Sequence, residues 1–381
     1  MSFALLALIC GVAMLGPIIS VNRLAPLPVV IGELAVGVVL GRTGLNVLDP
    51  DDATLTFMAQ IGFALVMFVA GSHVPVRTPA LRGGLRTGIL RAIGVGILAV
   101  PLGLVVGQLF GTGHGPLYAV LIASSSAGVV MPLLGTTSVT SAPGVQFLVQ
   151  LAVADAACII ALPLVLDPAN ALRAAIGSVV ILLVAGVFFV VLSWAERTGR
   201  RRRLHDLSEE RGLAMELRVT LTLLFVLAAI AATMHISVML AGFAMGLAVA
   251  AVGEPRRLAN QAFALTEGFF APIFFVWLGS SLDLRILVSN PDAIWLGVAV
   301  GAAAVLAHGL LAFSRQPLPL AVSTSAQLGV PVAAAALGRS TGLLGGGEAT
   351  ALLLGAVVTI AVVTGLSKRT IDLVQTAGAT A

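Results

Sequence analysis

The chain has 381 residues, of which 59% are hydrophobic and only 10% are charged, against roughly 25% charged residues in soluble domains. A soluble fold of this size could not cover so much apolar surface, so the composition predicts a polytopic membrane protein and argues against cytosolic or secreted enzymes. In a membrane protein the net charge of +4 reports topology, so we expect a lipid membrane and no nucleic acid as partner.

Long apolar runs follow one another along the whole chain. A helix that crosses the hydrocarbon core needs about 20 mostly apolar residues. The candidate segments, about thirteen in all, are 3–20, 27–41, 53–72, 88–110, 116–136, 144–166, 171–195, 214–233, 236–252, 259–282, 292–313, 318–338 and 347–366. They are continuously apolar, whereas barrel strands would alternate. The predicted fold class is therefore an all-α membrane protein.

The basic residues predict the orientation of these segments. With thirteen spans, sixteen of the 21 Lys and Arg residues fall on one side and four on the other. Basic loops stay in the cytoplasm, so we expect the amino terminus outside the cell (inner) membrane and the carboxyl terminus inside. The run Arg200–Arg203 is interpreted as a positive-inside anchor, with a lipid-phosphate or partner site as the alternative.

The order of the segments suggests an inverted repeat. Six segments, one linker segment and six further segments give a first repeat at 1–166, a linker helix at 171–195 and a second repeat at 214–366. An odd linker makes the second repeat enter from the opposite face. We expect a single transmembrane transporter domain and no soluble regulatory domain.

The fifth and twelfth segments are equivalent in this scheme, and each carries a proline after small polar residues. Pro132 follows Ser124, Ser125 and Ser126, and Pro331 follows Gln327. Proline removes a backbone donor and clashes with the preceding turn. Inverted-repeat transporters place the substrate between helices broken at equivalent positions. The pattern predicts two crossed, interrupted helices; ordinary proline kinks are the alternative.

Asp155 lies in the middle of an apolar segment with no basic residue within ten positions. An ionisable group there costs at least about 2.5–3.5 kcal/mol on insertion scales, which points to a function. Such a carboxyl can hold either a proton or a cation. Asp155 is therefore predicted to be the shared site, with Ser124, Ser125, Ser126 and Gln327 beside it; a buried structural aspartate is the alternative.

Two further ionisable residues lie in apolar segments. His308 can donate to a carboxylate when protonated, and we expect it to pair with Asp155 in the empty site. A histidine that only packs in the core or at the cytoplasmic interface is the alternative. Glu33 is either a second titrating site or a residue with a helix-packing or snorkelling role, and the latter is favoured because it lies near a segment end.

Motifs of other functional classes do not occur in the sequence. The chain has no GxGxxG unit and no Walker motif, so transport would be secondary and no cofactor is expected. It also has no GxSxG, HExxH or paired histidines at ligand spacing, so we expect neither an enzyme nor a bound transition metal.

The sequence resembles the monovalent cation:proton antiporters of the second cation:proton antiporter family, which includes NapA-type antiporters and the membrane part of Kef-type systems. The resemblance rests on VNRLAPLPVVIGELAVGVVLGRTGL, IGFALVMFVAGS, LIASSSAGVVMPLL, ALPLVL, HISVMLAGFAMGLAVA and GFFAPIFFVWLGSSLDL. It implies a dimer domain and a six-helix core domain in a NapA/NhaA-like fold, with a homodimer as the assembly. It also implies interrupted helices that cross beside the ion-binding aspartate.

The sequence departs from the family pattern at the expected site. Family members carry Asp-Asp, Asn-Asp or Gln-Asp, but Ala154 precedes Asp155 here. The lysine of the antepenultimate helix corresponds to His308, and the penultimate helix has no acid around Gln327–Val330. We also expect no Kef-type nucleotide-sensing domain. These departures leave the identity of the cation open.

Together, these features predict a secondary transporter that exchanges sodium or potassium for protons by alternating access. With one carboxyl per protomer, one proton would replace one monovalent cation, so exchange would be electroneutral. The alternatives are a proton-coupled exporter of an organic solute or ionophore on the same scaffold, and a gated ion conduit or regulatory subunit.

Overall fold

The structure, a computed structural model, describes residues 2–20, 29–72, 81–134, 139, 141–198, 211, 213–234, 238–253, 256–282 and 284–375. Every element in this part of the chain is helical. The elements are α1 (Phe3–Ala13), α2 (Leu15–Ser20), α3 (Val29–Leu40), α4 (Ala53–Ser72), α5 (Leu81–Leu109), α6 (Gly115–Ala123), α7 (Ala127–Leu134), α8 (Ala142–Leu166), η1 (Pro168–Asn170), α9 (Ala171–Arg197), α11 (Met215–Thr233), α12 (Val238–Val252), α13 (Arg256–Leu265), η2 (Thr266–Phe270), α14 (Ala271–Ser281), α15 (Leu284–Ser289), α16 (Pro291–Gly309), η3 (Leu310–Ser314), α17 (Leu318–Ser323), α18 (Gly329–Ser340) and α19 (Gly346–Gln375).

Eight helices in the described residues are long and apolar enough to cross a membrane, and three shorter helices are also apolar. With the interrupted pairs α6–α7 and α17–α18, they coincide with the segments predicted from the sequence. The chain is therefore an integral membrane protein with an all-α fold. The count of about thirteen crossings stays a prediction, because length and composition alone identify eight.

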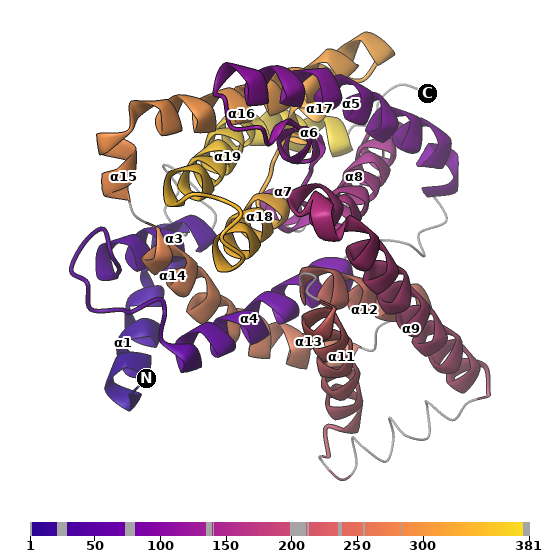
Figure 1. Cartoon of the computed structure of the whole chain (residues 1–381). Coiled ribbons are helices and arrows are strands. Elements are labelled where there is room, and N and C mark those ends of the chain that lie inside the picture. Colours follow the sequence, from indigo (N-terminus) through magenta and orange to yellow (C-terminus); the bar gives the residue numbers. More distant parts are fainter. Residues whose placement is uncertain are drawn as a thin grey trace.

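The helices form two bundles that face each other (Figure 1). One, here called the break bundle, contains both interrupted helices and consists of α5–α8 and α16–α19. The other, here called the scaffold bundle, is built around α3, α4, α12 and α14, and α9 and α11 pack on α12. α14 leads through the short α15 into α16, so the chain passes from one bundle to the other there.

The contacts between helices repeat in the way that an inverted repeat requires. α3 packs on α14, and the equivalent contact in the other repeat joins α12 to α4. In the break bundle, α5 packs on α8 as α16 packs on α19, and the contact of α7 with α19 is matched by that of α18 with α8. This pairing is expected from two halves related by a pseudo-two-fold axis.

Glycines set the close approach of the scaffold helices. A Cβ added to Gly37 of α3 would lie 2.2 Å from the carbonyl oxygen of Val276, on α14. The equivalent crossing has the same device, because a Cβ on Gly246 of α12 would lie 2.1 Å from the carbonyl oxygen of Phe68, on α4. In lipid, such small residues allow the van der Waals contact between backbones that drives helix association.

Gly246→Ala is expected to lower the thermal stability of the purified protein, because its methyl group would overlap the α4 backbone. The expected cost is about 1–3 kcal/mol, the range for overpacked sites. Gly186→Ala on α9 is the matched control, because a Cβ there meets nothing within 4 Å. If both variants melt at the wild-type temperature, the α4–α12 crossing is not set by glycine contact.

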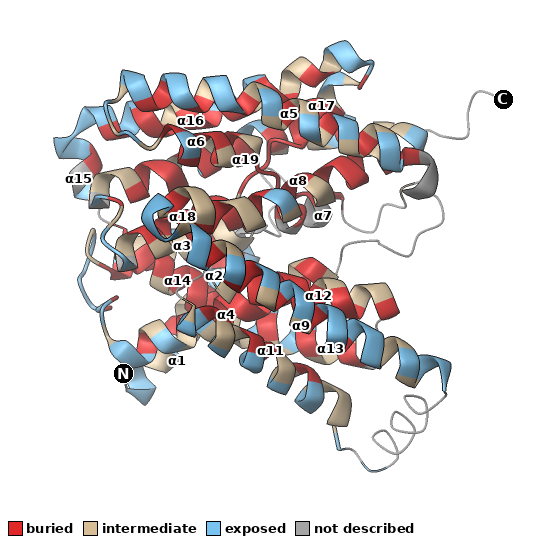
Figure 2. Ribbon diagram, turned by 45° about the vertical axis from the view of Figure 1, so that its right-hand side comes forward, coloured by how far each residue is buried: buried red, intermediate tan, exposed pale blue. Residues whose placement is uncertain are grey.

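The outside of both bundles is apolar. Large exposed hydrophobic side chains line α5 and α9, among them Ile97 and Leu183, and Figure 2 shows these two helices with much of their surface exposed. Buried residues concentrate where the helices meet, including the breaks of both interrupted helices. The exposed faces are those that lipid would cover.

Candidate functional site

The first interruption lies at Ser124–Ser126, between α6 and α7. Ser124 caps α6 in an extended conformation, and both its N–H and its Oγ donate to the Leu121 carbonyl. The Ser126 carbonyl accepts from the N–H groups of Val129 and Val130 at the start of α7. All three serines are buried. Their backbone is therefore held inside the protein, as non-helical backbone at membrane depth must be.

The second interruption lies between Ser323, which ends α17, and Gly329, which begins α18. Its backbone also finds partners inside the protein, since the N–H of Gln327 donates to Thr359 Oγ1 on α19 over 3.2 Å. Thr359 therefore satisfies one of the groups that the break frees. Residues 323–327 are almost completely buried.

The two interruptions bond directly to each other. Ser125 Oγ in the first break donates to the carbonyl of Thr324 in the second, over 2.7 Å. In return, Gln327 Nε2 in the second break donates to the carbonyl of Leu121, at the end of α6, over 2.6 Å. Each break thus supplies a side-chain donor for a backbone carbonyl of the other. The predicted pair of crossed, interrupted helices is confirmed.

The prolines lie beyond the breaks and not at them. Pro331 is the third residue of α18, and Pro132 lies within α7. A proline at position i lacks the N–H that would bond the carbonyl at i−4. Pro331 therefore leaves the Gln327 carbonyl without its helical donor, which helps to end the helix at the break that precedes it.

Asp155 lies in the middle of α8 and only 5% of its surface is exposed. Its Oδ2 accepts a hydrogen bond from the N–H of Ala127, the first residue of α7, over 3.4 Å. The carboxyl group therefore faces the amino-terminal end of α7, where the helix dipole favours negative charge. Within the described residues this N–H is its only hydrogen-bond donor, so most of its lone pairs remain available for a proton or a cation.

His308, on α16, is completely buried, and its Nδ1 lies 2.7 Å from Thr324 Oγ1 in the second break. No hydrogen bond or ion pair joins it to Asp155, although the structure describes both residues. The expected direct pairing of the two side chains is therefore wrong for this conformation. The sequence predicts that both residues lie at mid-membrane depth. It does not predict which neighbouring side chain the imidazole ring of His308 contacts.

Glu33 lies away from these hydrogen bonds, on α3 of the scaffold bundle. Its side chain is 4% exposed, and its Cγ is 3.0 Å from the position that a Cβ on Gly16 would take. A buried side chain of this kind does not snorkel to the interface, so the packing interpretation fits better. Glu267 is close enough to interact with it electrostatically.

A polar chain that was not predicted from the sequence leads from the second break toward the short segment between η3 and α17. Gln316 Nε2 donates to Gln150 Oε1 over 2.8 Å, and Gln150 Nε2 donates to Thr324 Oγ1 over 3.3 Å. All three residues are buried. Gln150, a polar residue in an otherwise apolar segment five positions before Asp155, was the signal available in the sequence.

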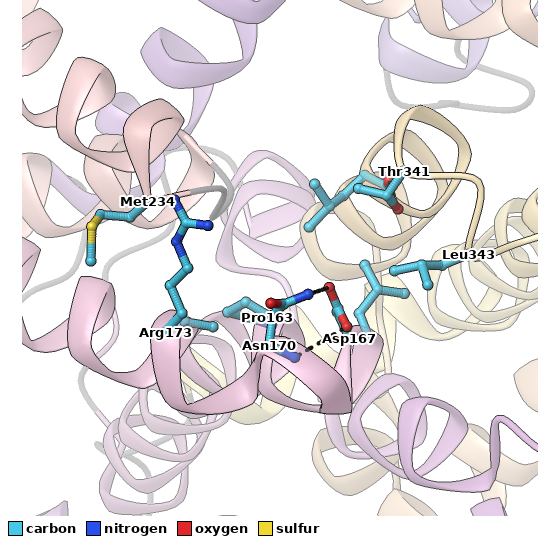
Figure 3. A pocket seen from close by; sticks show the side chains of 10 residues that line it. Pro163, Asp167, Asn170, Arg173, Met234, Thr341 and Leu343 are labelled. Atoms are coloured by element: carbon cyan, nitrogen blue, oxygen red, sulfur yellow. Dashed lines mark hydrogen bonds between the residues drawn. The ribbon is translucent and has the colours of Figure 1, made fainter.

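Two cavities open near the loops at one end of the helices. The larger, about 500 Å³, lies between α4 and α14 of the scaffold bundle and α18 of the break bundle, with Gln60 and Arg339 among its polar lining residues. The smaller, about 250 Å³, adjoins it at Leu337 and Thr341. In Figure 3, Asn170 bonds Asp167 at the edge of the smaller cavity, through its backbone N–H and its side-chain amide.

Comparisons with known proteins agree with this architecture. YjbQ of Bacillus subtilis, named as a candidate Na⁺/H⁺ antiporter, is 27% identical over 303 residues, which cover 76% of this chain and 49% of YjbQ. The glutathione-regulated potassium-efflux system protein KefC of Salmonella typhimurium is 27% identical over 286 residues, which cover 71% of this chain and 44% of KefC. The chain thus spans about half the length of these relatives.

A solved structure has the same fold. The sodium proton antiporter MjNhaP1 of Methanocaldococcus jannaschii, determined at pH 8, matches with a TM-score of 0.67 over 98% of this chain and 97% of the other, at 17% identity. The family described as "Sodium/hydrogen exchanger, transmembrane" matches residues 10–371, nearly the whole chain. On this match, the chain belongs to the transmembrane sodium/hydrogen exchanger family.

Proposed function

We propose that this protein exchanges a monovalent cation, sodium or potassium, for protons, and that Asp155 is the shared binding site. One observation carries the proposal: a single buried carboxyl with unused lone pairs faces the crossing of two interrupted helices. A carboxyl in this position binds a proton or a cation, and one displaces the other. The relatives are named for sodium/proton antiport and for potassium efflux, which supports the class of substrate.

The polar groups of the breaks would complete the cation site. Ser124, Ser125, Ser126 and Gln327 are buried beside the crossing, and the break carbonyls are oriented by the bonds between the two helices. The buried Oε1 of Gln327 has no hydrogen-bond partner within the described residues. Oxygen atoms of this kind replace part of a cation's hydration shell. These oxygen atoms would supply the cation ligand that the Ala154 side chain does not provide.

Exchange would proceed by alternating access, with the break bundle moving against the scaffold bundle. The 500 Å³ cavity between α18 and the scaffold helices supports this, since it lies where the two bundles would separate. The same proposal includes a first repeat that ends at 166, a linker helix at 171–195 and a second repeat that begins at 214. It also includes the outside position of the amino terminus and a homodimer built on the scaffold bundle.

The test of the function is proton flux into proteoliposomes that contain the purified full-length protein. Separate gradients of sodium, lithium and potassium, and an organic cation alone, define the substrate. Flux that depends on one of the alkali cations supports the proposal. Equal flux with and without alkali cations would instead favour an organic substrate or a conduit.

An imposed membrane potential is expected to leave the exchange rate and direction unchanged at fixed ion gradients. The reason is that Ala154 leaves one carboxyl at the site, so one proton replaces one monovalent cation and no net charge moves. The measurement is proton flux with valinomycin-clamped potentials of both signs in sodium media. A rate that changes with the potential would show that a second charge moves.

A further inference from the structure

Thr324, in the second break, is in contact with three polar groups from three elements. Its Oγ1 lies 2.7 Å from the carbonyl oxygen of Ala321 on α17, 2.7 Å from His308 Nδ1 on α16 and 3.3 Å from Gln150 Nε2 on α8. Its own carbonyl accepts from Ser125 in the first break. The residue is completely buried, so water does not compete for these contacts.

Counting hydrogens fixes the direction of these bonds. A hydroxyl has one hydrogen to donate. The Ala321 carbonyl can only accept, and two oxygens at 2.7 Å without a hydrogen between them repel, so the hydroxyl hydrogen must point to Ala321. The contact with His308 Nδ1 then needs its hydrogen from the imidazole. This holds whichever way the Gln150 amide is oriented, because the Ala321 carbonyl cannot change its role.

The other imidazole nitrogen is left without a hydrogen in the neutral ring. His308 Nε2 is buried and has no hydrogen-bond partner within the described residues. This nitrogen therefore has a free lone pair, and it is the atom of the ring that can accept a proton.

We propose that Thr324 is a positioning residue that holds neutral His308 in the Nδ1–H tautomer, so that Nε2 is the atom that accepts a proton. Protonation of Nε2 then puts a positive charge on the ring that is bonded to Thr324 in the second break, whose carbonyl accepts from Ser125 in the first. His308 thereby makes the charge beside the two breaks depend on pH. This deepens the proposed function and rests on it only for its role in exchange.

The surroundings of His308 allow this role to be isolated. On the helices packed against α16, Arg91 is held by Gln146 and Ser314. Tyr118 and His114 both bond Glu348 at the far end of α6 and α19. The remaining charged groups of these helices whose side chains the structure describes are Arg86, Arg285, Lys368, Arg369 and Asp372. Among the described residues none of these, nor Asp155 on α8, forms an ion pair or hydrogen bond with His308.

The test is ¹⁵N magic-angle-spinning NMR of the full-length protein, labelled with ¹⁵N-histidine and embedded in lipid, from about pH 5 to pH 8. The spectrum of His308→Gln identifies the signals of His308. In the wild type we expect the neutral ring to carry its hydrogen on Nδ1 with roughly a tenfold excess, the effect of about one hydrogen bond. Nε2 should gain a proton as the pH falls.

Two variants separate positioning from packing. Thr324→Val keeps the shape without the hydroxyl and should reduce the excess of the Nδ1–H tautomer toward unity and move the midpoint of the pH–flux curve. Thr324→Ser keeps the hydroxyl and should preserve both. A wild-type ring with its hydrogen on Nε2, a ring that never changes protonation state, or an unchanged tautomer ratio in Thr324→Val would each overturn the proposal.

The same experiments distinguish this inference from the function it refines. The tautomer is measured without transport, so a protein with the expected tautomer but no cation-dependent flux would refute the exchange and leave the positioning intact. Cation-dependent flux with the opposite tautomer would refute the positioning alone. If Thr324→Val fails to fold, the wild-type and Thr324→Ser spectra still decide the matter.

Discussion

Asp155→Asn is expected to abolish cation-driven proton flux, with a loss on the order of 100-fold or more, the scale on which positioned proton-transfer groups act. The amide keeps the shape of the side chain and can still face the Ala127 N–H through its oxygen. It can neither release a proton nor compensate the charge of a cation. The measurement is the initial rate of flux in proteoliposomes at matched protein density.

Asp292→Asn is the matched control, because Asp292 is an exposed acid in the first turn of α16. It should retain wild-type flux. Both variants should run as folded protein on size-exclusion chromatography, since a neutral side chain at position 155 removes the cost of a buried charge. Substantial cation-driven flux in Asp155→Asn would remove Asp155 from the mechanism.

Gln327→Leu is expected to reduce flux about tenfold or more without preventing insertion. Leucine has a similar volume, but it lacks the amide that donates to the Leu121 carbonyl over 2.6 Å, a bond with a net value of about 0.5–1.5 kcal/mol. That carbonyl keeps its bonds from Ser124. The bond is one of two that hold the breaks against each other, so its loss loosens the geometry around Asp155. Flux and thermal stability are measured together.

Gln108→Leu, at an exposed position near the end of α5, is the control for the change in composition. It should behave as the wild type in both measurements. If Gln327→Leu exchanges at the wild-type rate, the reciprocal bonding of the breaks is structural and has no part in transport.

Much of the fold was predictable from the sequence. The apolar runs locate the helices because the hydrocarbon core imposes a length and a composition on each span. The small polar residues before Pro132 and Pro331 indicated where both breaks lie. In lipid, polar side chains and unpaired backbone groups cost free energy, so they occur where non-helical backbone is buried in protein or lines a cavity. Asp155 was identifiable for the same reason, as a charge whose burial must be compensated.

The hydrogen bonds between the helices at the site were not predictable from the sequence. The bond between Ser125 and Thr324 joins residues 199 positions apart, and the bond between Gln327 and Leu121 joins residues 206 apart. Such partners depend on how helices are rotated about their axes, which hydropathy does not report. His308 shows the consequence: charge alone suggested Asp155 as its partner, but the ring lies against Thr324.

The central claim, that one carboxyl binds the proton and the cation in turn, is tested most directly by proton release on cation binding. Purified wild-type protein and Asp155→Asn are held in weakly buffered solution with a pH-sensitive dye, and sodium or potassium chloride is added while choline chloride serves as the ionic-strength control. The account predicts the release of about one proton per protomer from the wild type, because one cation displaces one proton at a shared carboxyl, and none from Asp155→Asn. Cation binding by the wild type, seen by calorimetry, without any proton release would contradict it.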